Sequence, residues 1–175
     1  RDYYASRGLG DVYKRQMYNA VKQANPKVLF GISPQGTLSG NEKQSADVQT
    51  WGQTAGYCDY LLPQLYFGFQ NSTAPFAETA AFWAEQVTCP DVLLWIGICT
   101  YKIGQQDTWA GDGMTEWQTD SQVVSKELEL LCNMDGIDGA AIYDYASTFQ
   151  PESSVSEILS SERDAIQVLL QTPAN

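Results

Sequence analysis

The sequence predicts an α/β fold of about four βα units, equivalent to the C-terminal half of a (β/α)8 TIM-type barrel. Apolar runs of strand length alternate along the chain with longer segments of helical periodicity. The runs are continuous in hydrophobicity, which is typical of parallel strands covered on both faces. The loops after the strands are long and those after the helices are short, as expected if a barrel carries its working face at the strand C-termini.

Each element follows from a local pattern of apolar periodicity, caps and turn formers. In chain order we expect the end of a helix at 17–24, a strand at 28–32, a loop at 33–45, a short helix at 46–54, a strand at 60–66, a helix at 72–87 capped by Ser72 or Thr73, a strand at 92–101, a polar loop at 102–120, a helix at 121–134, a strand within 139–149 and a helix at 153–170. An open doubly wound sheet is the alternative architecture. A full barrel needs about eight units and about 250 residues, so this chain is expected to be half of one.

The second predicted strand contains Pro63 and Gln64 among apolar residues. Proline cannot donate to a sheet ladder, and a buried glutamine needs hydrogen-bond partners. Both residues fit if they lie near the C-terminal end of the strand, where the ladder is ending. If Gln64 points inward, it faces a ligand cleft, and Tyr66, two residues on, shares its face.

The first sixteen residues stand apart from the rest. They hold four of the ten basic residues and show no clean period, and their ending, GLGDVYKRQ, resembles the translated adapter sequence of some metagenomic gene models. We expect 1–16 to be a non-native leader, 17–171 to form the partial barrel and 172–175 to be a tail. A genuine helical lead-in to Met17 is the alternative.

Composition excludes several functional classes. The net charge of −11 disfavours a nucleic-acid partner, and no apolar stretch is long enough for a membrane span. The absence of histidine removes Ser–His and Cys–His nucleophile systems and histidine metal sites. The four cysteines form no CxxC pair, and free buried thiols are favoured over a disulfide. No metal cage and no phosphate-binding glycine fingerprint is present, so no metal or cofactor is expected.

Four blocks of sequence then follow one another in the order and spacing of a known family. NPKVLFGISPQG, GYCDYLLPQLYFGF, IGICTYKIGQQDTWAGDGMTEW and GAAIYDYASTF together resemble the glycosyl-hydrolase-like family 10, bacterial proteins with a barrel catalytic domain. The resemblance covers about 17–170 and implies that the four strands are the fifth to eighth of the barrel. It implies hydrolysis of O-glycosidic bonds in peptidoglycan-type or other polysaccharide, and an extracellular or cell-envelope location.

Most glycoside hydrolases use two carboxylates, so acids just past the strand ends are the catalytic candidates. Only Asp144 directly follows a strand. The chain has YDYAS where YSYSS-like versions occur in the family, so a structural role for Asp144, bonded to loop backbone, is equally compatible. Asp107, Asp112 and Glu116 are expected to be solvated loop charges or turn caps.

Polar and aromatic residues near the strand ends are the candidates for substrate binding. A tyrosine offers a ring face and a hydroxyl, a glutamine amide both donates and accepts, and Lys102 can bind a sugar hydroxyl or carboxylate or pair with an acid. Trp109 and Trp117 either form the wall of a sugar subsite or pack their loop onto the rim of the barrel. The candidates are Gln35, Gln64, Tyr66, Tyr101, Lys102, Trp109, Trp117, Tyr143 and Tyr145.

The sequence thus predicts a fragment of an exported bacterial glycoside hydrolase. The fragment alone is expected to be inactive, because the common layout places acids after the fourth and seventh strands and none follows the presumed seventh. A non-catalytic carbohydrate-binding barrel is the alternative. A nucleotide- or flavin-dependent α/β enzyme is disfavoured by the missing phosphate loops.

Overall fold

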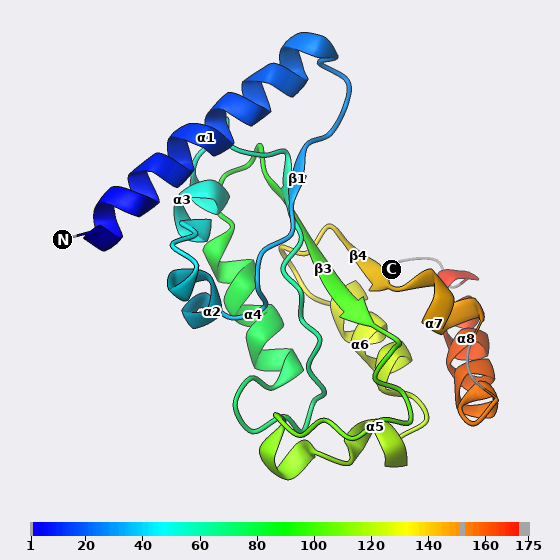
Figure 1. The fold of residues 1–175 in the computed structure, drawn as a ribbon. Helices are drawn as coiled ribbons and strands as arrows, with labels where there is room; N and C mark the ends of the chain where they lie inside the picture. Colours follow the sequence, from blue (N-terminus) through cyan, green and yellow to red (C-terminus); the bar gives the residue numbers. More distant parts are fainter. Residues whose placement is uncertain (1, 151–152, 172–175) are drawn as a thin grey trace.

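The computed structural model describes residues 2–150 and 153–171 (Figure 1), so the predicted tail at 172–175 lies outside the described residues. The strands are β1 (Gly31–Ile32), β2 (Tyr60–Leu61), β3 (Leu93–Cys99) and β4 (Gly139–Tyr143). The helices are α1 (Asp2–Ala24), α2 (Leu38–Lys43), α3 (Val48–Gln53), α4 (Phe76–Gln86), the 3-10 turn η1 (Gly111–Gly113), α5 (Glu116–Thr119), α6 (Val123–Cys132), α7 (Tyr145–Phe149) and α8 (Ser156–Gln171).

The four strands form one parallel sheet in the order β1-β2-β3-β4. Each strand pairs with the next one along the chain, which is the order that successive βα units give in a barrel wall. The predicted α/β class and the parallel pairing are confirmed, and the sheet is consistent with part of a TIM-type barrel. Figure 1 shows β3 pointing towards the end of the molecule where α5 lies, so the loops after the strands gather there.

The regular part of β2 is shorter than the predicted strand, and Pro63 explains why. Gln64 still makes parallel bridges to Gln35 on one side and Gly97 on the other. The Pro63 carbonyl accepts from the Gly97 N–H at 2.9 Å, while Pro63 itself has no N–H to return. Gln64 therefore lies near the C-terminal end of the pairing, as predicted.

The core lies between the sheet and the helices on one of its faces. Leu94, Ile96 and Ile98 of β3 are fully buried, and α4 and α6 both contact this strand. Side chains that alternate with these point the other way, and Gly97 lines a cavity on that second face. The helices α4 and α6 thus pack against the face that carries these leucine and isoleucine side chains, and a cavity lies on the other face.

Several local expectations need correction. Residues 38–43, predicted as loop, form α2, because Thr37 caps it by accepting from the Gly40 N–H at 3.2 Å. Neither Ser72 nor Thr73 caps α4, whose N-cap is Pro75. The Asn71 side chain instead accepts from the N–H groups of Thr73 and Ala74, at 3.0 and 2.9 Å. Residues 145–149, grouped with the last strand, form α7.

The N-terminal helix α1 runs without interruption across the predicted leader boundary at residue 16. Asp11 accepts from the indole N–H of Trp51 at 2.8 Å, and the Arg15 guanidinium lies 4.6 Å from the ring centre of Tyr57. The boundary itself stays a prediction.

No helix among the described residues combines the length and hydrophobicity needed to cross a bilayer.

Candidate functional site

Two adjoining cavities lie where the strands end. The first, of about 550 Å³, is lined by residues that include Ser33, Gln64, Tyr66, Gly97, Tyr101 and Tyr143. The second, of about 470 Å³, shares Gln64, Tyr66 and Tyr101 with the first and adds Gln35, Asn71, Thr73, Lys102, Asp107 and Trp109. Because they share three side chains, the two cavities form one cleft, the strand-end cleft. Seven of the ten predicted site residues line it.

Three tyrosines at strand ends form the aromatic centre of the cleft. The ring of Tyr66 stacks on Tyr143 with centres 5.8 Å apart, and Tyr101 meets both rings edge-on, at 5.9 and 6.1 Å. Burial raises the pKa of Tyr66, and burial together with the neighbouring ionisable groups raises the pKa of Tyr101 to about 12. Both phenols therefore remain hydrogen-bond donors at neutral pH, while Tyr143 leaves 55% of its surface exposed to the cleft and solvent.

Gln64 is the polar group at the junction of the two cavities. Its amide nitrogen donates to the Ser33 hydroxyl at 3.1 Å. Gly97, its partner in the next strand, lies close to the backbone of this segment, since a Cβ there would be 3.1 Å from the Pro63 carbonyl oxygen. Ser33 was not among the predicted residues, although its place directly after the first strand was a usable signal.

Lys102 and Asp107 form a largely buried ion pair that lines the second cavity. The ammonium donates to the Asp107 carboxylate and to the Tyr66 backbone carbonyl, each at 2.6 Å. The other Asp107 oxygen accepts from the Trp109 N–H at 3.2 Å. Of the two roles expected for Asp107, a solvated loop charge is wrong and a turn cap is confirmed, because its carboxylate accepts from a backbone N–H two residues on. The pair ties the loop after β2 to the loop after β3.

Glu116 makes a second tie between these two loops. It is 2% exposed, and its two oxygens accept from the N–H groups of Phe69 and Gln70, both at 3.0 Å. Gly68 leaves room for the carboxylate, since a Cβ at Gly68 would fall 1.9 Å from it. Of the two roles expected for Glu116, a solvated loop charge or a turn cap, the first is wrong, because the residue, like Asp107, is a buried structural acid. Asp112 is exposed, as expected.

We expect Glu116→Gln to lower the free energy of unfolding by about 1–2 kcal/mol, because an amide can accept only one of the two backbone hydrogen bonds. Urea unfolding followed by circular dichroism measures the change. Glu78→Gln on the exposed side of α4 is the matched control, with an expected change within about 0.5 kcal/mol. Equal destabilisation by the two variants would contradict this account of Glu116.

Asp144, the predicted catalytic acid, is the N-cap of α7. Its Oδ1 accepts from the Ser147 N–H at 2.8 Å, and Ser147 Oγ accepts from the Asp144 N–H at 3.2 Å in a capping box. The backbone hydrogen bond from Ser147 lowers the pKa of Asp144. The carboxylate is therefore held ionised, which suits a nucleophile or electrostatic stabiliser better than a proton donor. Asp144 adjoins the cleft through Tyr143 but lines neither cavity.

Two predicted binding residues lie apart from the cleft. Trp117 on α5 is 1% exposed and belongs to the core, so its substrate-stacking role is corrected to packing. Tyr145 is exposed but lines neither cavity, and the centre of its ring lies 4.9 Å from that of Phe149.

Within the described part of the chain, no group of three or more histidine, cysteine or acidic side chains is arranged to hold a metal ion.

Comparison with known proteins identifies the family. A family model described as "Glycosyl hydrolase-like 10" matches residues 11–111, more than half of the chain. The chain belongs to this family. The resemblance inferred from the four strand-end blocks is thus confirmed. The match begins at residue 11, inside the segment expected to be a leader.

Curated relatives carry corresponding names. The chain is similar to "Glycosyl hydrolase DigH" of Escherichia coli K12 and of Shigella flexneri, with 28% identity over 161 residues that cover 81% of this chain and 36% of each relative. It is also similar to "Glycosyl hydrolase YngK" of Bacillus subtilis, with 32% identity over 105 residues, 51% of this chain and 20% of that protein. The chain spans about a third of the length of the DigH proteins.

Proposed function

We propose that the strand-end cleft binds a glycan and that the protein carrying this chain hydrolyses O-glycosidic bonds of a cell-envelope polysaccharide such as peptidoglycan. The observation that carries the proposal is the cleft itself. Three tyrosine rings and the Gln64 amide meet at the carboxyl end of a parallel sheet, where barrel enzymes place their sites. Apolar ring faces beside hydrogen-bonding groups suit the mixed surface of a sugar. Membership of a glycosyl hydrolase-like family supports the same reaction class.

The sheet supports a place in a (β/α)8 barrel. Its strands are parallel and sequential, and strands β1 and β4 are its two edges. We propose that further βα units pair with these edges and complete the barrel, and that our strands are its fifth to eighth. The share of the relatives that the chain covers is compatible with such additional units. We also propose an extracellular or cell-envelope location, on family grounds alone.

A non-catalytic carbohydrate-binding barrel is the second candidate. The first cavity, which holds the tyrosine centre, has no carboxylate among its lining residues. Asp107 in the second cavity is ion-paired, and Asp144 is occupied as a cap. This distribution favours binding over catalysis for the described residues taken alone.

Titration with chitooligosaccharides, followed by calorimetry and by chemical shifts of the backbone amides around Gln64, tests the proposal. We expect saturable binding, with shifts concentrated at the cleft. Maltooligosaccharides, which differ in linkage geometry and lack the acetamido group, are the comparison ligand. Absence of binding by every glycan of the peptidoglycan type would refute the proposed function.

Tyr143→Ala is expected to weaken binding about tenfold or more, because the exposed ring would supply an aromatic anchor. Tyr143→Phe keeps the ring and removes only the hydroxyl, so its affinity is expected to lie much nearer that of the wild type. The dissociation constants of the three proteins separate ring from hydroxyl. Equal affinities for the wild type and Tyr143→Ala would remove Tyr143 from the site.

A further inference from the structure

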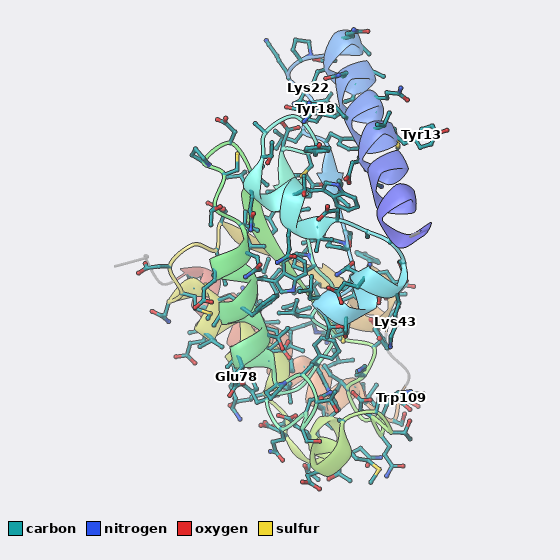
Figure 2. All side chains as sticks on the ribbon, turned by 90° about the vertical axis from the view of Figure 1, so that its left-hand side faces the viewer. Tyr13, Tyr18, Lys22, Lys43, Glu78 and Trp109 are labelled. Carbon is teal, nitrogen blue, oxygen red and sulfur yellow. The ribbon has the colours of Figure 1, made fainter. Side chains whose placement is uncertain are left out.

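Trp109 is 85% exposed, in contrast to the other tryptophans of the chain. Trp51, Trp83 and Trp117 are at most 3% exposed, and Trp95 stacks on Tyr60 with ring centres 4.7 Å apart. Trp109 lines the second cavity of the strand-end cleft. Figure 2 shows it at the outer surface, at the end of the molecule opposite Tyr18 and Lys22. A large apolar ring is therefore presented to solvent at the edge of a cavity.

The loop that carries Trp109 is held in place on both sides of the ring. The Trp109 N–H donates to Asp107, whose own N–H donates to the Met114 carbonyl at 2.9 Å. The Ala110 carbonyl accepts from the Ser72 N–H at 3.0 Å, which fastens this loop to the loop after β2. The ring is thus presented by a fixed backbone, so a ligand that stacks on it pays little ordering entropy.

Polar side chains line the second cavity together with the Trp109 ring. They are the Lys102–Asp107 ion pair and the side chains of Asn71, Thr73 and Gln35. The first cavity, in contrast, is lined mainly by tyrosine rings and apolar residues. An aromatic wall beside hydrogen-bonding groups is the arrangement that recognises a sugar ring, whose faces are apolar and whose rim carries hydroxyl groups.

We propose that the second cavity is an outer subsite that binds a further sugar residue of a chain, with Trp109 stacked on one face of that sugar. The inference rests on the proposed glycan-binding function and deepens it. The strand-end cleft would accommodate successive residues of a linear glycan, with a disaccharide unit at the tyrosine centre and the residue beyond it beside Trp109. Long chains are then preferred over mono- or disaccharides.

The test compares chitobiose with chitotetraose on the full 175-residue chain. The indole N–H signals of the five tryptophans are recorded by NMR, and that of Trp109 is assigned by its loss in Trp109→Phe. We expect chitotetraose to bind at least tenfold more tightly than chitobiose and to shift the Trp109 signal. Trp109→Ala should lose most of this length preference while keeping its affinity for chitobiose. Trp109→Phe, which keeps an aromatic face, should retain part of it.

Tyr13→Ala is the matched control, because Tyr13 is an exposed aromatic residue on α1, remote from Trp109 in Figure 2. Its length preference should equal that of the wild type. If the wild type prefers the longer chain and Trp109→Ala does so equally, the subsite is refuted and the glycan-binding cleft stands. Equal binding of the two oligosaccharides by the wild type also refutes the subsite. If the wild type binds neither, the proposed function fails together with the subsite.

Discussion

Glu127→Met is expected to stabilise the fold by about 2–3 kcal/mol at neutral pH. Glu127 lies on α6 and is completely buried, and neither carboxyl oxygen has a hydrogen-bond partner among the described residues. A buried polar group without a partner costs about 1–3 kcal/mol. Methionine has a similar length and flexibility but no polar oxygens, so it removes this cost without opening a large cavity.

The same residue is expected to make stability depend on pH. Burial, reinforced by the nearby carboxylates of Glu162 and Glu116, raises the pKa of Glu127 well above its usual value of 4.5. Above about pH 4.5 the unfolded chain releases this proton while the folded chain keeps it. The folded state then binds more protons, so stability falls as pH rises, by about 1.4 kcal/mol per pH unit until the folded pKa is reached.

Glu127→Gln separates the two effects, because it keeps a buried polar group and cannot titrate. Urea unfolding at several pH values between 4.5 and 8 should show a shallower decline for this variant than for the wild type. The pKa values of Glu116 and Glu162 are also raised, so a residual decline is expected in both proteins. Asp59 and Asp120 have lowered pKa values and lose their contribution only below this range. Parallel profiles for wild type and Glu127→Gln would contradict the assignment.

The apolar periodicity of α6 indicates in part that Glu127 is buried. Val124 and Leu131 mark the buried face, and Glu127 lies three residues after the first and four before the second, on the same face. A glutamate at such a position is normally expected at the edge of the buried face, with its carboxylate in contact with solvent. Its burial follows from the packing of α6 against β3, β4, α4 and α8. The last of these helices also places Glu162 against the N–H groups of Val124 and Ser125, both at 2.9 Å. Helical periodicity within one segment does not specify that neighbour.

The residues of the candidate site that lie at strand ends could be predicted from the sequence. Gln64, Tyr66 and Tyr143 lie at strand ends, and parallel pairing brings such residues to one edge of the sheet. The loop acids were not predictable in this way. Glu116 accepts from backbone groups 46 and 47 residues away, and such long-range partners leave no local sequence signal.

The two loop tryptophans show the same limit. Trp109 and Trp117 flank one glycine-rich turn, and the sequence does not distinguish them. Trp109 precedes the turn and projects to solvent, while Trp117 lies on α5 and packs into the core. What distinguishes them is the tertiary contact of α5 with the rest of the fold, which periodicity in a four-residue helix cannot reveal.

The isolated chain is expected to bind glycans without measurable turnover. Hydrolysis needs one group that donates a proton and a second carboxylate that acts as nucleophile or base. Among the described residues, Asp107 in the strand-end cleft is held by Lys102, and Asp144, which adjoins the cleft, has a lowered pKa through its cap to Ser147. The capped environment of Asp144 does not resemble the apolar pocket that raises the pKa of a catalytic acid. Loss of general acid catalysis alone costs about 10²–10⁴-fold in rate.

Release of reducing ends from chitohexaose and from peptidoglycan glycan strands measures this directly. We expect the wild-type chain, Asp144→Asn and Asp107→Asn to be indistinguishable from the buffer background, although the wild type binds the same oligosaccharide. Asp112→Asn changes an exposed acid of the loop that carries Asp107, and it serves as the control for the loss of one negative charge. Turnover by the wild type that disappears in Asp144→Asn and persists in Asp112→Asn would overturn the expectation. Asp144 would then be a working catalyst despite its cap, and the acid–base pair would have to be sought within this chain.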